Sequence, residues 1–225
     1  MNKVIMMKKV EANAIHGGLT TTSKLDGIQS YSTPTALCVT GFKMAKIPGS
    51  ICADCYAKKG NYHMYQNGIE PAQHARYEAM LYDPAWVDAM VASLINEQYF
   101  RWFDSGDVPS VAALERIVEV CLATPDTLHW LPTREYGMVK DFIAKHGRDS
   151  IPRNLVIRLS AMYPDQPVIV PKSLQGVPGI ETSNVHSKGH PTLGEECGAR
   201  FTNNMCDGCR TCWSRVVKAV SYYKH

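Results

Sequence analysis

The stretch Tyr99-Phe100-Arg101-Trp102-Phe103-Asp104-Ser105-Gly106-Asp107 decides the fold class of this chain. Its first five residues are rich in aromatic side chains and predict a buried β-strand, and the last four form a polar loop. Residues 110–123 follow with apolar side chains at helical spacing. A strand, a loop and a helix in this order are the repeating unit of parallel sheets with crossover helices.

The same unit recurs toward the C-terminus. Further strands are predicted over residues 127–131, 154–159, 168–170 and 179–185, and a helix over 135–146 with Gly147 as its C-cap. Upstream, residues 71–82 and 84–96 predict helices that each carry a proline in the first turn, and residues 1–35 predict an irregular arm or edge hairpin. This order indicates an α/β fold, with a small or incomplete β/α barrel of TIM type as first choice and an open α/β sheet as second.

Length and composition suit one globular domain of 225 residues, 45% of them hydrophobic. We expect an N-terminal arm with a cysteine knuckle over residues 1–65, a β/α core over 66–190 and a metal-binding segment over 191–225. No apolar run reaches the roughly 18 residues of a membrane helix, and the charged start does not resemble a secretory signal, so we expect a cytoplasmic protein. The net charge of +3 permits a nucleic-acid partner without demanding one.

In both fold types, the loops after the carboxyl ends of the strands carry the chemistry. Asp104 and Asp107 lie in such a loop, where one carboxylate could act as a nucleophile or base while the other is protonated or binds a donor edge of a substrate. A carboxylate nucleophile suits attack at a sugar anomeric carbon. The alternative is that Asp107 or Ser110 only caps the next helix.

Three further side chains lie on the predicted strands or at their ends. Arg134, in Pro132-Thr133-Arg134, could bind a phosphate or a carboxylate through its two-pronged guanidinium, or could simply be solvated at a helix start. Trp102 and Trp130 could form a stacking platform for a base, or could belong to a packed aromatic core.

Seven of the eight cysteines form two groups, and in a reducing compartment such groups are read as metal ligands before disulfides. Cys197, Cys206, Cys209 and Cys212 follow the spacing C-x8-C-x2-C-x2-C, which suits a closed four-coordinate Zn²⁺ site. The last residue, His225, could replace Cys197 in that set.

The other group, Cys38, Cys52 and Cys55, has the spacing C-x13-C-x2-C. Three thiolates suit an iron–sulfur cluster with one open iron, and they also suit Zn²⁺ with a fourth ligand such as His63. Buried free thiols are the remaining alternative. The eighth cysteine, Cys121, lies on the apolar face of a predicted helix and is expected in the core.

Three fragments together resemble the tRNA-guanine transglycosylase superfamily. They are Asp104-Ser105-Gly106, Leu131-Pro132-Thr133-Arg134, and the cysteines Cys206, Cys209 and Cys212 followed by Trp213-Ser214-Arg215 and His225. In that family the corresponding segments are a base-gripping D-S-G-G loop, an L-P-T-R segment and a zinc motif, and they occur in the same order on a β/α barrel. The short length is similar to that of small phage-encoded relatives, which would place the protein in the cytoplasm of the host cell.

The resemblance implies a DNA-guanine transglycosylase that exchanges guanine in DNA for a free 7-deazaguanine base through an aspartyl–sugar intermediate. It also implies zinc at the C-terminal cysteines and contacts to the base from the loop with Ser105 and Gly106. Under this hypothesis we expect Asp104 and Asp107 to share the nucleophile and base-binding or general-acid roles, with Trp102 and Trp130 as candidates to stack on the extruded base and Arg134 and Arg158 as candidates for phosphate or base contacts. The chain departs from the pattern where the family has its nucleophilic aspartate, because Leu128 stands there. The cysteines Cys38, Cys52 and Cys55 have no counterpart in that family.

Two other function classes stay open. Three cysteines near the N-terminus of a partial barrel are similar to radical S-adenosylmethionine enzymes, although the spacing is not their usual compact one. A non-enzymatic zinc module that binds nucleic acid is the third hypothesis, and it predicts that removing both aspartates leaves binding intact.

Overall fold

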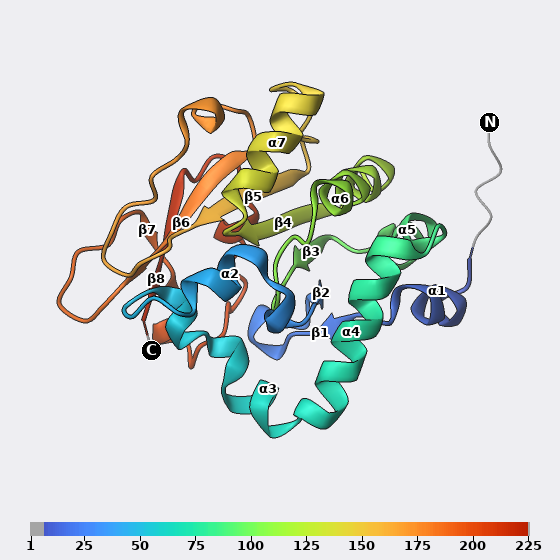
Figure 1. Ribbon diagram of the computed structural model, residues 1–225, viewed down its shortest axis with the longest axis horizontal. Helices are drawn as coiled ribbons and strands as arrows, with labels where there is room; N and C mark the ends of the chain where they lie inside the picture. Colours follow the sequence, from blue (N-terminus) through green and yellow to red (C-terminus); the bar gives the residue numbers. More distant parts are fainter. Residues whose placement is uncertain (1–6, 225) are drawn as a thin grey trace.

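The computed structural model of the protein describes residues 7–224 and has one mainly parallel sheet at its centre (Figure 1). The eight strands lie in the order β1-β2-β3-β4-β5-β6-β8-β7, and only the pair β1–β2 is antiparallel. The strands are β1 Thr20–Thr21, β2 Gln29–Tyr31, β3 Tyr99–Trp102, β4 Leu128–Thr133, β5 Leu155–Ser160, β6 Ile180–His186, β7 Glu195–Glu196 and β8 Ala219–Tyr223. The sheet is not closed, since β1 and β7 form its two edges.

Seven helices accompany the sheet in the described residues: α1 Lys9–His16, α2 Val39–Met44, α3 Gly60–Met64, α4 Gln66–Tyr82, α5 Trp86–Leu94, α6 Val111–Ala123 and α7 Tyr136–His146. The larger core lies where α4 to α7 pack against one face of the strands, around Trp86, Trp102, Leu114, Leu131 and Phe142. Figure 1 shows these helices gathered to one side of the sheet.

A smaller core covers the opposite face of the sheet. Trp130 of β4, Val156 of β5 and Val220 of β8 pack there against Cys212 and Trp213. The indole N–H of Trp213 donates to the carbonyl of Phe100 over 2.9 Å. The cysteine-rich C-terminal segment therefore closes the face that the helices leave open.

The α/β class and the mainly parallel sheet predicted from the sequence are confirmed. Ser110 is the N-cap of α6, because its hydroxyl accepts from the N–H of Ala113 over 3.1 Å. The N–H of Gly147 donates to the carbonyl of Ile143 at the end of α7. The hairpin expected before residue 35 is the antiparallel pair β1–β2.

Two predictions about local structure are wrong. Residues 168–170 form no strand; Ile169 is exposed, and the N–H of Val168 donates to the side chain of Asn184 instead of to a neighbouring strand. Pro71 lies inside α4, which begins at Gln66, rather than in its first turn. The short strand β8, which the sequence prediction lacks, pairs in parallel with β6, and β2 pairs in parallel with β3.

Candidate functional site at the carboxyl ends of the strands

The loops after β2, β3, β4 and β5 meet at one edge of the sheet, because neighbouring parallel strands end on the same side. Phe103 has φ +51°, an uncommon backbone conformation that turns the chain out of β3 and into the loop with Asp104. The N–H of Thr33, just after β2, donates to the carbonyl of Ser105 over 2.9 Å. A Cβ atom at Gly106, where φ is +81°, would lie 1.9 Å from the Thr33 hydroxyl oxygen. Ser105 and Gly106 thus bind the β2 and β3 loops to each other.

Asp104 is a buried carboxylate with one free oxygen. Its Oδ2 accepts from the hydroxyl of Tyr62 over 2.6 Å, and its backbone carbonyl accepts from the hydroxyl of Tyr56. Its Oδ1 is buried and has no hydrogen-bond partner among the described residues. Burial, and after it the charge of Asp104, raise the pKa of Tyr62 well above its usual value, so its hydroxyl stays a donor.

Asp107, in contrast, is fully engaged in holding the next loop. Its Oδ1 accepts from the hydroxyl of Thr133 over 2.6 Å and its Oδ2 from the N–H of Arg134 over 2.9 Å. Burial raises the pKa of Asp107 to about 6 against the opposing effect of these hydrogen bonds. The two aspartates that the sequence treats as a pair therefore have different roles, and only Asp104 keeps a free acceptor.

The segment with Cys38, Cys52 and Cys55 lies over this edge of the sheet. The carboxylate of Glu135, which follows β4 and is buried, accepts from both the N–H and the hydroxyl of Thr40, over 2.7 and 2.6 Å. The N–H of Ile51 donates to the carbonyl of Met162, beyond β5. Figure 1 shows α2 and the chain after it in front of one end of the strands.

These three cysteines are free thiols that lie close enough for charges on Cys52 and Cys55 to raise the pKa of Cys38. A Cβ atom at Gly41 would lie 3.6 Å from the sulfur of Cys38 and 3.8 Å from that of Cys52, so both sulfurs face the space that the missing side chain leaves. Burial is the main cause that raises the pKa of Cys38, and the negative charges of Asp107, Cys55, Cys52 and Glu135 add to it. Cys38 is therefore a neutral thiol by itself and becomes a thiolate when it binds a metal cation.

Within residues 7–224, no three His, Cys, Asp or Glu side chains stand in the geometry of metal ligands. The chemistry of the donor set nevertheless fits a soft metal at the first group, since the sulfurs of Cys38 and Cys52 face one space beside Gly41 and Cys55 is close enough for its charge to act on both thiols. His63, the fourth ligand considered from the sequence, lies exposed on α3. The two carboxylates whose charges act on Cys38 already accept hydrogen bonds: Glu135 from Thr40, and Asp107 from Thr133 and from the N–H of Arg134.

The C-terminal cysteines gather on the other face of the sheet. Cys212 is buried in the smaller core, Cys197 and Cys206 pack against it, and Cys209 is exposed. Burial, and then the charges of its neighbours Cys197, Asp26 and Cys209, raise the pKa of Cys206 to about 11. The set of four thiols suits zinc, which stays a prediction. His225 lies outside the described residues.

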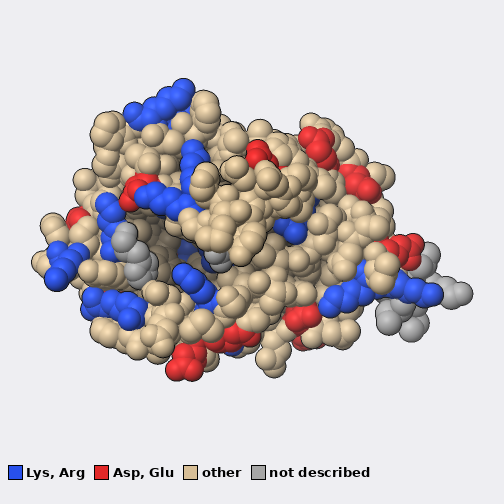
Figure 2. Space-filling view, turned by 90° about the horizontal axis from the view of Figure 1, so that it is seen from below, with Lys and Arg blue, Asp and Glu red and all other residues tan. Residues whose placement is uncertain are grey.

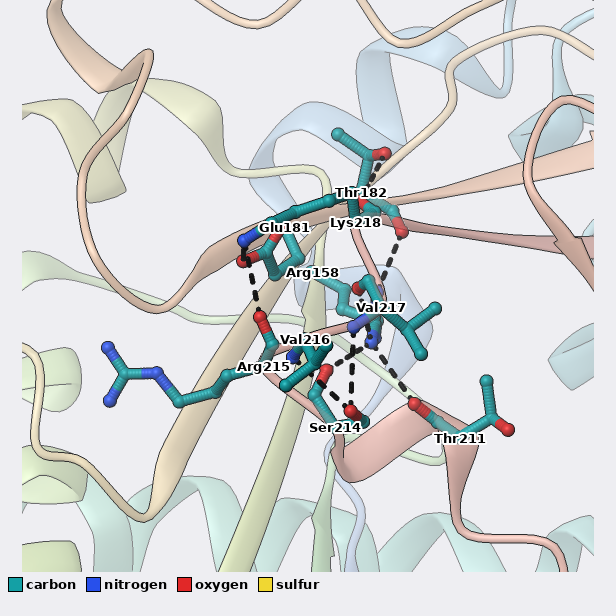
Figure 3. A network of polar contacts seen from close by, with 9 residues as sticks. All are labelled: Arg158, Glu181, Thr182, Thr211, Ser214, Arg215, Val216, Val217 and Lys218. Atoms are coloured by element: carbon teal, nitrogen blue, oxygen red, sulfur yellow. Dashed lines mark hydrogen bonds and ion pairs between the residues drawn. The ribbon is translucent and has the colours of Figure 1, made fainter.

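Arg158, expected at a phosphate or a base, belongs to the scaffold of this second group. Its guanidinium is fully buried and donates to the carbonyls of Thr182, Thr211, Cys212, Ser214 and Val217 over 2.7–3.1 Å. Figure 3 shows it pointing from β5 into the turn that precedes β8, with Glu181 and Lys218 paired beside it. All three nitrogen atoms of this guanidinium therefore donate to backbone carbonyls.

The remaining side chains predicted for the site divide between core and edge. Trp102 is fully buried in the larger core and stacks on His129 at 6.0 Å between ring centroids. Trp130 is 5% exposed and lies under the guanidinium of Arg101, 4.7 Å from the ring centroid. Arg134 stays at the edge, where its Nε donates to the carbonyl of Ala161 over 2.9 Å.

Comparison with known proteins gives a family and nothing beyond it. The model of the family described as Gene product 88 matches residues 18–215, most of the chain. The chain belongs to the Gene product 88 family. No curated protein and no solved structure matches it. The matched range of this Gene product 88 protein includes both cysteine groups and the loops at the carboxyl ends of β2, β3, β4 and β5. No helix among the described residues has the length and apolar character needed to cross a membrane.

Proposed function

We propose that the protein is an iron–sulfur enzyme whose cluster is held by Cys38, Cys52 and Cys55. The observation that carries this proposal is the position of the three free thiols: they lie over the carboxyl ends of parallel strands, beside a buried carboxylate with a free oxygen. In α/β folds, this edge is where ligands bind. When bound, such a cluster supplies one-electron chemistry and an iron that has no protein ligand.

The chain's own residues would hold and orient the site. Glu135 fixes the loop of Cys38 through Thr40, and Asp107 fixes Arg134 after β4. Asp104 offers Oδ1 as a hydrogen-bond acceptor for a substrate N–H or O–H, while Tyr62 keeps its other oxygen in place. We also propose that the open sheet is an incomplete β/α barrel. A sheet curved in this way would surround a substrate at the carboxyl ends of its strands.

Anaerobic purification tests the proposal directly. We expect a brown protein with iron and sulfide, and a colourless, iron-free protein for Cys38→Ser, Cys52→Ser or Cys55→Ser. The matched control is Cys121→Ala, which alters a buried cysteine of α6 outside both groups and should keep the iron. A colourless wild-type protein with zinc at the first group would contradict the proposal.

Guanine exchange in DNA is a second candidate, and the free Oδ1 of Asp104 is the observation that favours it. A carboxylate attacking the sugar C1′ needs an oxygen that is not already engaged, and Asp107 has three donors on its two oxygens. Incubation with DNA and a 7-deazaguanine base, followed by digestion and mass spectrometry, would reveal the new nucleoside. The Asp104→Asn variant should then be inactive, and unchanged activity in it would exclude Asp104 as the nucleophile.

A further inference from the structure

The segment from Cys38 to Tyr65 differs in charge from the rest of the chain. It has four lysines and one aspartate, so its formal charge equals the +3 of the whole protein. Lys43, Lys46, Lys58 and Lys59 are all exposed, and of these four Lys59 is paired with Asp54. Positive charge is therefore concentrated on the segment that carries the first cysteine group.

The same segment also exposes aromatic rings. Phe42, Tyr56 and Tyr65 are 52%, 59% and 61% exposed, and they are three of the five large aromatic side chains exposed among the described residues. The ammonium of Lys46 lies over the ring of Phe42, 4.5 Å from its centroid, so a positive charge rests on one face of this exposed ring. Exposed rings interleaved with lysines are typical of surfaces that bind single-stranded nucleic acid, where bases stack and phosphates pair.

This surface continues into the candidate site. The hydroxyl of Tyr56 accepts from Arg101 over 3.2 Å and donates to the backbone carbonyl of Asp104. Arg101 takes part in no ion pair within 4 Å among the described residues, and its Nε is buried without a hydrogen-bond partner. Figure 2 shows a hollow on this side of the molecule, bordered by Lys and Arg side chains.

We propose that the segment with Phe42, Tyr56, Tyr65 and the four lysines binds single-stranded nucleic acid and leads a nucleotide to the carboxyl ends of the strands. This inference deepens the proposed function, on which it rests, by naming the substrate class of that site. Bases would stack on the exposed rings, and the lysines would pair with phosphates. A base would then present a donor to Asp104 Oδ1 and its phosphate would approach Arg101.

Fluorescence anisotropy with the full-length protein tests this proposal. The probes are a labelled mixed-sequence DNA strand, the RNA strand of the same sequence and the DNA duplex. We expect either or both single strands to bind more tightly than the duplex, with an affinity that falls steeply as salt rises. The RNA and DNA arms identify the natural source of the strand.

Matched variants locate the surface. Phe42→Ala and Tyr65→Ala should each weaken binding by about fivefold to a hundredfold, the loss of one stacked base. The double variant Lys43→Glu/Lys46→Glu should weaken it further and reduce its salt dependence. Tyr82→Ala and Lys140→Glu, which alter exposed side chains on α4 and α7, are the controls and should bind like the wild type.

Three outcomes would overturn the proposal: tighter binding of the duplex, equal binding by all variants, or binding to phosphatidylserine vesicles with none to oligonucleotides. Iron content is measured on the same preparations. Because the surface variants leave all seven grouped cysteines intact, a loss of oligonucleotide binding with normal iron separates this inference from the cluster proposal. Conversely, cysteine variants that lose iron but bind oligonucleotides normally would show that the nucleic-acid surface does not depend on the cluster.

Discussion

The two cysteine segments of this protein are anchored in opposite ways. The C-terminal one is fixed through its backbone, since buried Arg158 donates to four of its carbonyls and Asp26 accepts from the N–H groups of Asp207 and Gly208 and from Arg210. The N-terminal one is mostly exposed and is held at the edge of the sheet by a few side-chain contacts, foremost Glu135 with Thr40. The C-terminal segment is therefore built into the scaffold through buried backbone hydrogen bonds, whereas the N-terminal segment rests on the edge of the sheet through a small number of side chains.

The largest expected effect comes from removing the buried guanidinium. Arg158→Met leaves several buried carbonyls without a donor, so we expect a loss on the order of 3–5 kcal/mol in the free energy of unfolding. Urea denaturation followed by circular dichroism measures it. The control Arg153→Met alters an exposed arginine just before β5 and should change stability by less than about 0.5 kcal/mol. Equal stability of the two variants would refute the scaffold role of Arg158.

Two cysteine variants, one in each group, test whether the two cysteine segments differ in their contribution to stability. Cys209→Ser removes one of the four C-terminal thiols and should cost about 2 kcal/mol or more of stability if zinc is bound there. Cys55→Ser should remove iron and leave the unfolding midpoint nearly unchanged. Thermal unfolding and metal analysis of both proteins decide the matter, and a larger stability loss in Cys55→Ser would reverse the roles assigned to the two groups.

The contact between Glu135 and Thr40 predicts a smaller, local effect. Glu135→Ala should weaken iron retention about 10–100-fold, because the loop of Cys38 loses its support. Glu135→Gln, which keeps one acceptor, should recover part of it. Iron release to a chelator gives the rates, with the exposed Glu119→Ala of α6 as control. Zinc at the C-terminal group should not change, and its loss would show that the effect is global.

Two buried histidines predict that the stability of the sheet, which supports both cysteine groups, falls in acid. Loss of metal at low pH can therefore follow either from protonation of the thiolates or from unfolding of the sheet. Burial lowers the pKa of His129 to about 3 and that of His16 to about 4, so both are neutral when folded. The unfolded chain binds these protons near pH 6.5, so stability falls as the pH drops from about 6.5 toward 3. His129→Gln should flatten this decline, whereas the exposed His74→Gln of α4 should not. Urea midpoints across this pH range measure the difference, and identical slopes would contradict it.

The sequence predicted the strand–loop–helix order because apolar periodicity and capping residues are local signals. Helix α6 and its N-cap Ser110 are an example, as is the loop that follows β3. The strand predicted over residues 168–170 is absent because three consecutive apolar residues can also lie in a loop. There the N–H of Val168 donates to a side chain instead of to a neighbouring strand. Strands as short as β2 give no periodicity, and β2 is recognised only through its pairing with β3 far along the chain.

The site was predicted in part. Asp104, Asp107 and Arg134 do lie at the carboxyl ends of strands. The roles of Glu135, Tyr56 and Tyr62 were missed, because their partners are 42–95 residues away in sequence. Arg158 was assigned to a ligand because an arginine on a strand does not reveal whether it meets solvent or buried carbonyls. Alternation along β5, where Val156 and Arg158 share one face opposite Ile157, was the signal available.

The adjacency of β2 and β3 has a consequence for the order in which the protein matures. These strands are neighbours in the sheet, yet the whole first cysteine segment and helices α2 to α5 lie between them in the chain. Cys38, Cys52 and Cys55 thus reach the edge of the sheet only after a long crossover has been closed. If the proposed cluster is bound there, its delivery is a step that follows folding and depends on a finished sheet. The proposal then predicts that the protein without iron accumulates as a stable, nearly native species.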